Sequence, residues 1–183
     1  MTPPSAGSIE SLCKLERELL RKPELVPFDP GCIGCEGIAV KASSASAGGW
    51  LFKEEPNHYS YSDLERDGST LWSGVANPVA RKHLRNVKPG DRVLYYHTGD
   101  ERAIVGEMRV VEGPMPDPGD DDPKSVAVKV EAVRRWPKPV TLQQIKDDPA
   151  FAGWDLVRIS RLSVMAVSAD HWKRLEKMSG ISQ

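Results

Sequence analysis

The chain has 183 residues, of which 39% are hydrophobic and 28% charged, and its formal net charge at pH 7 is −1. This composition is typical of a globular protein, and the length suffices for one medium domain plus a tail or for two very small domains. The sequence contains no run of about 18 apolar residues, so we expect no transmembrane helix. Its N-terminus lacks the basic start and apolar core of a secretory signal. The near-neutral charge argues against a protein that holds duplex DNA through many phosphate contacts.

Three cysteines are an odd and small number, which argues against a disulfide framework and predicts a reducing compartment. We therefore expect the protein in the cytoplasm, or in the nucleus of a eukaryotic cell. Cys32 and Cys35 have the C-x-x-C spacing of half a zinc site. Because the sequence lacks a second C-x-x-C or an H-x-x-x-H, we expect plain thiols, no metal and no cofactor.

Residues 1–47 differ in pattern from the rest of the chain. An apolar stripe from Ile9 to Leu20 follows Ser8, a favoured N-cap residue, and predicts a short helix. Pro and Gly then break the periodicity, and "KASSASAGG" is typical of a flexible linker. We expect an N-terminal extension over residues 1–47, made of a short helix and a linker, followed by one folded domain over residues 48–183.

From Trp50 onward, strand patterns dominate. "GWLFKEEP" predicts a short strand that stops at Pro56. The runs "RVLYYHTG", "AIVGEMRVVEG" and "SVAVKVEAVRRW", rich in β-branched and aromatic residues, predict three more strands. "PMPDPGDDDPKS" predicts a solvated acidic loop between the last two of them. "LVRISRLSVMAV" predicts a strand pair or one long bent strand.

Helix start signals fall between these strands. The expected N-caps are, in chain order, Ser62 or Asp63, Asn77, Thr141 and Ser168. Pro78 suits the first position of the second helix, and Gln144 completes a capping box in the third. In the second helix, Val79, Leu84 and Val87 are expected to face inward. Short strands interspersed with helices predict a small α+β domain on a mixed, barrel-like sheet.

The sequence carries no enzyme signature. A G-x-S-x-G elbow, a Walker loop, a dinucleotide fingerprint and an H-E-x-x-H pair are all absent. The four histidines, His58, His83, His97 and His171, are not spaced as a metal or catalytic set. For His97, in the middle of a predicted strand, a hydrogen-bonded structural role outweighs a ligand role. We therefore expect a binding protein rather than an enzyme.

Aromatic residues gather in the first half of the predicted domain. They are Trp50, Tyr59, Tyr61, Trp72, Tyr95 and Tyr96, and they alternate with the polar residues Lys53, Asn77, Arg81 and His97. Aromatic faces with a few polar groups can hold a flat nucleobase by stacking and edge hydrogen bonds. The same composition equally fits a well-packed core with tyrosine hydroxyls at its edge. Composition leaves both interpretations open.

Taken in order, the motifs of the chain resemble the EVE domain, a member of the PUA-like superfamily. The motifs are "WLFKEEP", "YSYSDL", "LWSGVANPVARKHLR", "KPGDRVLYYHTGDERAIVGEMRVV", "PDP", "PVTLQQIK" and "RISRLSVMAVS". The resemblance begins at about Trp50 and runs nearly to the C-terminus. It implies an α+β fold in which a mixed, mostly antiparallel curved β-barrel is surrounded by helices. It also implies a non-catalytic module that recognises a modified nucleobase, notably modified cytosine in DNA, in an aromatic pocket.

Family motifs transfer to this chain residue by residue. They imply base contacts at Trp50, Lys53, Tyr61, Trp72, Gly74, Val75, Asn77, Tyr96, His97 and Ser163, and phosphate contacts at Arg81, Arg85 and Arg161. Trp72 and a second aromatic side chain would flank the base. The chain departs from the family pattern at Glu54, where Ser or Thr is usual, at Ala76, where Arg is usual, and at Met115, where Tyr is frequent. Loss of the Arg removes one phosphate contact.

The resemblance implies a nucleic-acid partner, with DNA expected ahead of RNA, and no membrane. Three alternatives stay open at this stage. The domain could recognise structured or modified RNA, it could bind a nucleotide or small molecule as ASCH domains do, or its pocket could be vestigial. Neither the modified base nor the oligomeric state follows from the sequence.

Overall fold

The computed structural model describes residues 47–181 of the chain. The predicted helix after Ser8, the Cys32/Cys35 pair and most of the predicted linker lie outside the described residues. The predicted boundary after residue 47 therefore stays a prediction. Within residues 47–181, no helix is long and apolar enough to cross a membrane.

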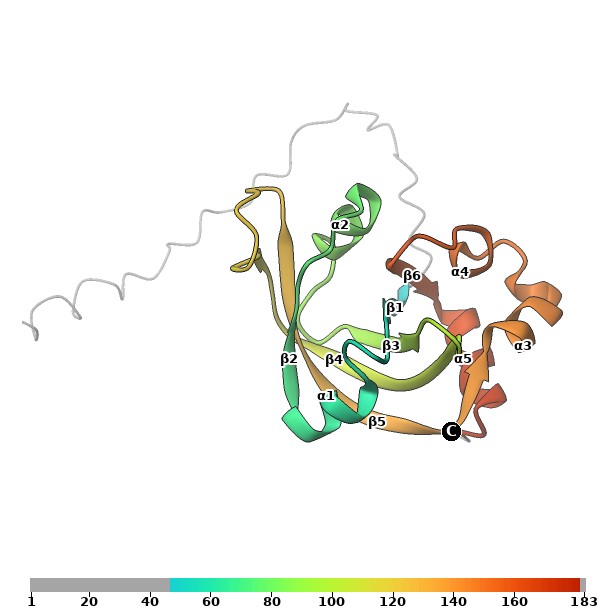
Figure 1. Ribbon diagram of the computed structural model, residues 1–183. Coiled ribbons are helices and arrows are strands. Elements are labelled where there is room, and N and C mark those ends of the chain that lie inside the picture. Colours follow the sequence, from blue (N-terminus) through green and yellow to red (C-terminus); the bar gives the residue numbers. More distant parts are fainter. Residues whose placement is uncertain (1–46, 182–183) are drawn as a thin grey trace, which may run out of the picture. The chain divides into compact units, whose positions relative to one another are not determined.

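A strongly curved six-stranded sheet forms the centre of the domain (Figure 1). Its strands are β1 (Ala47–Glu54), β2 (Ser69–Trp72), β3 (Arg92–His97), β4 (Ala103–Pro116), β5 (Val126–Thr141) and β6 (Val164–Ser168). The strand order is β2-β5-β4-β3-β1-β6. Only the β1–β3 pair is parallel in this sheet, and the remaining pairs are antiparallel. The predicted α+β class and mostly antiparallel sheet are confirmed.

Closure of the sheet into a barrel is not confirmed. β2 and β6 stand at the two edges of an open sheet, and neither pairs with the other in the described part of the chain. β2 itself was not predicted, because its four residues, "STLW", are too few to show a periodic pattern. It pairs with β5, with Trp72 opposite Val128.

The helices are α1 (Tyr61–Asp67), α2 (Pro78–Leu84), α3 (Leu142–Asp147), α4 (Asp155–Arg158) and α5 (Ala169–Met178), with a short 3-10 helix, η1, at Pro149–Phe151. The predicted caps Asn77, Thr141 and Ser168 are confirmed, and so is the capping box of Thr141 with Gln144. The cap of α1 is Ser60 rather than Ser62 or Asp63, because Asp63 is the third helical residue and its carboxylate accepts a hydrogen bond from the Ser60 amide.

Two further predictions are wrong. The segment over residues 156–167, predicted as a strand pair or one long bent strand, is a strand only from Val164 onward, where β6 begins, and α4 occupies Asp155–Arg158 in its first half. Leu156 lies in α4 and Leu162 in the loop that follows it, and both side chains are buried. Buried apolar residues in a helical turn and a loop therefore gave a pattern like that of a strand. Val79 does not face inward, since it is 52% exposed, and Ala80 takes the buried position beside Leu84 and Val87.

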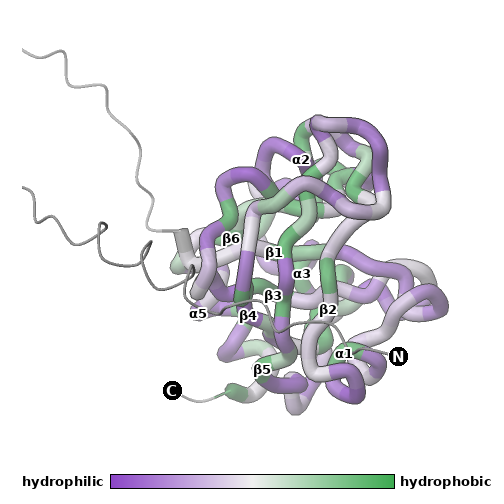
Figure 2. The backbone as a smooth tube through the Cα atoms, turned by 90° about the vertical axis from the view of Figure 1, so that its left-hand side faces the viewer, coloured by the Kyte–Doolittle hydropathy of each residue, from purple (hydrophilic) through white to green (hydrophobic). Residues whose placement is uncertain are grey.

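Side chains on one face of the sheet form a chain of aromatic contacts. Phe52 packs on Trp72 with ring centroids 5.2 Å apart, Trp72 on Tyr95 at 5.5 Å, and Tyr95 on Tyr61 at 5.4 Å. Gly106 permits this packing, because a Cβ atom there would lie 2.4 Å from the Tyr61 ring. Hydrophobic stretches accordingly lie along the strands, interrupted by hydrophilic positions (Figure 2). Phe52 and Tyr95 of this aromatic core hold the Trp72 ring in a fixed position.

Candidate functional site

A cavity of about 240 Å³ opens where β1 ends, against the last residues of β2. Trp72 forms its wall and is only 5% exposed, because Phe52 and Tyr95 hold the indole from the core side. The lining residues are Glu54, His58, Tyr59, Thr70, Leu71, Trp72 and Ser73. We call this space the Trp72 cavity. Its volume is below that of sites for drug-sized ligands, so it suits a single small ring.

Glu54 places a carboxylate at the rim of the Trp72 cavity. Its Oε1 accepts a hydrogen bond from the Glu55 amide at 3.0 Å and lies 3.1 Å from Nδ1 of His58. Its Oε2 has no hydrogen-bond partner within residues 47–181, so this oxygen is available as an acceptor. The amides of His58 and Tyr59 both donate to the Glu55 carbonyl at 2.9 Å, which fixes the loop that carries the rim.

Tyr59 forms the second aromatic side of the Trp72 cavity. Its carbonyl accepts a hydrogen bond from the Tyr95 hydroxyl at 2.7 Å, and its own hydroxyl donates to Asp67 at 3.0 Å. Partial burial raises the pKa of the Tyr59 hydroxyl above its usual value, and the Asp67 carboxylate adds to this effect. The phenol therefore stays neutral at physiological pH and is held as a fixed, uncharged wall.

The turn that follows Trp72 is fixed by the acidic loop before β5. Gly74 adopts a left-handed conformation with φ of 69°, and its amide donates to the Asp117 carboxylate at 2.7 Å. Asp117 is only 6% exposed, which corrects the prediction of a wholly solvated loop. Asn77 is the N-cap of α2 and accepts hydrogen bonds from the amides of Val79 and Ala80. Its amide oxygen is thus used within the protein.

The loop before β5 also engages Arg81. Its guanidinium donates to Asp122 at 2.6 Å and to Asp120 at 3.4 Å, and its Nε donates to the Val75 carbonyl at 2.5 Å. Its side chain is 15% exposed. Arg85, next on the same helical stripe, donates to the Lys124 carbonyl and stays exposed. These contacts join α2 to the acidic loop, and Asp120 and Asp122 neutralise the charge of Arg81 within the molecule.

A second cavity, of about 410 Å³, holds two of the predicted base contacts, Lys53 and Tyr96. The two residues are directly opposite each other in the β1–β3 pair. The Lys53 ammonium lies 5.7 Å from the centre of the Tyr96 ring and donates to the Ser160 carbonyl at 3.2 Å. The lining residues are Lys53, Tyr96, Thr98, Gly99, Arg102, Leu142, Lys146, Leu156, Val157 and Ser160. We call this space the Lys53 cavity.

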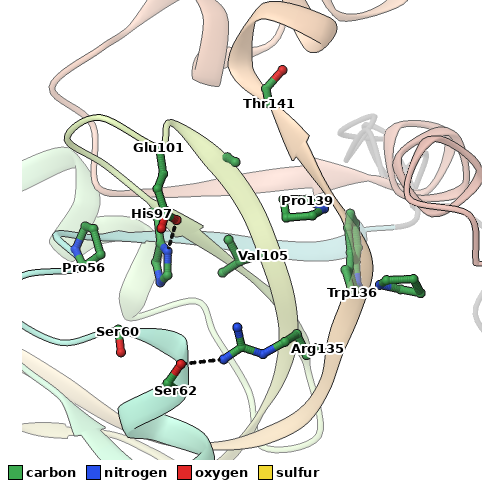
Figure 3. Close-up of a pocket in the computed structure, with 12 residues that line it drawn as sticks. Pro56, Ser60, Ser62, His97, Glu101, Val105, Arg135, Trp136, Pro139 and Thr141 are labelled. Carbon is green, nitrogen blue, oxygen red and sulfur yellow. Dashed lines mark hydrogen bonds and ion pairs between the residues drawn. The ribbon is translucent and has the colours of Figure 1, made fainter.

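His97 lies in a third and larger cavity, of about 510 Å³ (Figure 3). Its Nε2 accepts from the Tyr61 amide at 3.0 Å, so its Nδ1 carries the proton and donates to Glu101. On the opposite side, the Arg135 guanidinium donates to Ser62 at 2.8 Å and to Glu65 at 2.7 Å. The charged groups of this cavity are therefore paired with partners, and His97 has the structural role that the sequence favoured.

The remaining predicted residues are spread over the domain. Trp50 donates through its indole N–H to Asp91 at 2.9 Å, and Tyr61 is fully buried and donates through its hydroxyl to the Glu107 carbonyl at 2.6 Å. Neither lines the Trp72 cavity. The Ser163 carbonyl accepts from the Lys53 amide at 2.9 Å and joins β1 to the loop before β6. Arg161, in the same loop, is exposed.

Sequence reasoning thus identified Trp72 but missed most of what surrounds it. Thr70 and Ser73 lie within two residues of Trp72, but β2 is too short to show a strand pattern, so no sequence signal marked them. His58 and Tyr59 lie in a loop without any periodic pattern, so only the structure brings them to the cavity.

Comparisons with known proteins agree with this architecture. A sequence model described as the EVE domain matches residues 49–178. Human thymocyte nuclear protein 1 is 30% identical over 123 residues, which cover 53% of this chain and 55% of the human protein. The chain therefore spans about half the length of this curated relative.

Solved structures give the same picture. An NMR structure of a protein from Rhodopseudomonas palustris matches with a TM-score of 0.70 and 37% identity, covering 73% of this chain and 94% of that one. A crystal structure of human THYN1 in complex with DNA containing 5-methylcytosine matches with a TM-score of 0.67 and 25% identity, covering 73% and 98%. Together with the match over residues 49–178, these findings show that the chain belongs to the EVE domain family.

Proposed function

We propose that this protein is a non-catalytic module that binds nucleic acid through one modified base, held in the Trp72 cavity. Modified cytosine in DNA is the expected ligand. The observation that carries the proposal is the cavity itself, where the aromatic side chains of Tyr59 and Trp72 meet the free carboxylate oxygen of Glu54. The cytoplasm, or the nucleus of a eukaryotic cell, is the compartment where such a ligand would be met.

Each wall of the cavity has a specific task in this proposal. Stacking of a base on an aromatic side chain contributes roughly 1–3 kcal/mol. Trp72 can supply this without reorganisation, because its position is fixed by the core. The exocyclic amino group of cytosine is a hydrogen-bond donor that carboxylates recognise, and Oε2 of Glu54 is an unused acceptor in the described structure. A methyl group on the base would gain apolar contact with the aromatic walls.

The comparisons support this ligand class. A member of the same family, human THYN1, forms a complex with DNA containing 5-methylcytosine. A base can enter a cavity of this kind only after it leaves its stack, which costs a few kcal/mol in duplex DNA. Because the chain is near neutral and Arg81 is held by Asp120 and Asp122, we expect little net electrostatic attraction to repay that cost. We expect modest affinity for duplex and higher affinity for a single strand.

Fluorescence anisotropy with labelled oligonucleotides tests the proposal. Matched strands carry 5-methylcytosine or cytosine at one position, as DNA and as RNA. Ser73→Trp fills the cavity from an exposed rim position, while Val133→Trp adds the same bulk at an exposed site that does not line the cavity.

We expect tighter binding of the methylated DNA strand, a 5- to 150-fold loss (about 1–3 kcal/mol) in Ser73→Trp, and no loss in Val133→Trp. Equal affinity for both bases, or equal behaviour of the two variants, would show that the Trp72 cavity is not the base site. Tighter binding of the RNA strands would transfer the proposal to RNA.

A further inference from the structure

The Lys53 cavity differs from the other described cavities in the charge of its walls. Lys53, Arg102 and Lys146 line it, and no Asp or Glu does. No ion pair within residues 47–181 involves any of the three cations. In a chain of net charge −1, this is a local concentration of unpaired positive charge.

Lys53 is the most constrained of these cations. It sits on the second-last position of β1, half-buried, and the only hydrogen bond of its ammonium group in the described structure is the one to the Ser160 carbonyl. Burial lowers the pKa of the Lys53 ammonium from 10.5 to about 8. Such a shift indicates a charged group that lacks a compensating anion, since a neighbouring carboxylate would raise the pKa instead.

Tyr96 adds an unpaired hydrogen-bond donor to the wall of the Lys53 cavity. The residue is 96% buried, and it lines the cavity, yet its hydroxyl has no hydrogen-bond partner within residues 47–181. Burial raises the pKa of Tyr96 to about 12, so the hydroxyl keeps its proton and can donate it. The hydroxyl oxygen is not among the buried polar atoms without a partner, so it is accessible from the cavity and can donate to a ligand there.

Fixed backbone positions hold the other two cations at the cavity. Arg102 has φ of 43°, an uncommon conformation for a residue other than glycine, and its Nε donates to the Gly99 carbonyl at 3.0 Å. Lys146 lies in the last turn of α3. The Glu55 carboxylate lies beside Gly99 and accepts a hydrogen bond from the Thr98 hydroxyl.

From this arrangement we infer that the Lys53 cavity is an anion site that takes a phosphate group, bound by the Lys53 and Lys146 ammonium groups, the Arg102 guanidinium and the Tyr96 hydroxyl. Under the proposed function, on which this assignment of the ligand rests, the phosphate belongs to the backbone beside the bound base. Lys53 and Glu54 are consecutive on β1 and line the two cavities, so one strand end serves both the base and the phosphate.

Salt dependence of oligonucleotide binding provides the first test. Each phosphate contact contributes about 0.7 to the slope of log affinity against log salt for a single strand. We expect Lys53→Met and Lys146→Gln each to flatten the slope by about that amount, which makes the loss between 50 and 200 mM salt about 2.6-fold smaller. Lys129→Gln, which removes an exposed lysine outside the cavity, is the matched control and should keep the wild-type slope.

NMR titration of the Lys53 side chain provides the second test and separates the sources of phosphate. Its pKa is measured with inorganic phosphate, with 5-methyl-2′-deoxycytidine, with the corresponding 5′-monophosphate and with the oligonucleotide. We expect the phosphate-bearing ligands to raise the pKa and the nucleoside to leave it unchanged, because an anion favours the charged ammonium.

Base-selective oligonucleotide binding with an unchanged Lys53 pKa and an unchanged slope in both variants would overturn the phosphate site and leave the proposed function intact. A response to inorganic phosphate or the monophosphate in a protein without base-selective binding would overturn the assignment to nucleic acid.

Discussion

Substitution Lys53→Met tests whether the unpaired ammonium lowers the stability of the fold. The pKa of Lys53 is about 8 in the folded protein against 10.5 as its ordinary value, and 2.5 units correspond to about 3.4 kcal/mol. Because the side chain is only half-buried, solvent screens part of this cost, and we expect about 1–2 kcal/mol. Methionine keeps the apolar stem and removes the charge.

The direction of the pH dependence follows from linkage. A lysine with a lowered pKa in the folded state binds fewer protons there than in the unfolded state between pH 8 and 10.5, so stability rises with pH in this range. Below pH 8 both states are protonated, and the folded protein carries the full cost. Lys53→Met should therefore be more stable than the wild type by about 1–2 kcal/mol at pH 7, and the difference should shrink towards zero by about pH 10.5.

Urea unfolding of both proteins at a series of pH values from 6 to 10.5 measures this difference. Subtracting the two curves removes the contribution of other groups that titrate in the same range. A variant that is less stable than the wild type at pH 7, or a difference that does not change with pH, would refute the view that Lys53 is an uncompensated charge.

Three further predictions concern the packing, the helix cap and the rim carboxylate. Gly106→Ala should lower the free energy of unfolding by about 1–3 kcal/mol in urea denaturation, because its methyl group would lie 2.4 Å from the Tyr61 ring. An unchanged midpoint would show that the ring moves away at no cost. Asn77→Ala should cost about 0.5–2 kcal/mol by removing the cap of α2, without changing base preference in anisotropy titrations. Glu54→Gln should reduce the preference for cytosine over thymine strands, because an amide offers a weaker acceptor than a carboxylate; an unchanged ratio would remove Glu54 from base recognition.

Local sequence signals predicted the parts of the fold that depend on neighbouring residues. Asn77 with Pro78, and Thr141 with Gln144, form caps through contacts within three residues, so their patterns can be interpreted without the rest of the chain. The prediction of a strand in the first half of residues 156–167 was wrong for the opposite reason. The apolar residues of this segment are buried by packing against distant elements, and burial looks the same in a strand, a helical turn or a loop.

The candidate site was predicted only where an aromatic residue signalled it. Trp72 stands out in the sequence, whereas the partners that define its cavity come from a loop whose position depends on long-range contacts such as Tyr95 to Tyr59. Trp50 and Tyr61 carry the same chemical signal as Trp72, but Asp91 and Glu107 bind their polar atoms in the core. Residue type cannot distinguish these roles, because an aromatic ring serves a core and a base site equally well.

Charge pairing finally decides how a nucleic acid could lie on this domain. The basic helix α2 looked like the phosphate-binding element in the sequence, yet Asp120 and Asp122 hold Arg81, and this pairing also fixes the turn beside Trp72. Lys53, Arg102 and Lys146, none of which has an ion pair within residues 47–181, lie together instead at the Lys53 cavity beside the end of β1. A strand whose base enters the Trp72 cavity would therefore run across the end of β1 towards α3 rather than along α2. The ion pairs of Arg81 with Asp120 and Asp122 hold α2 near the turn beside Trp72. The phosphate contact is assigned instead to Lys53, Arg102 and Lys146, which form no ion pair within residues 47–181.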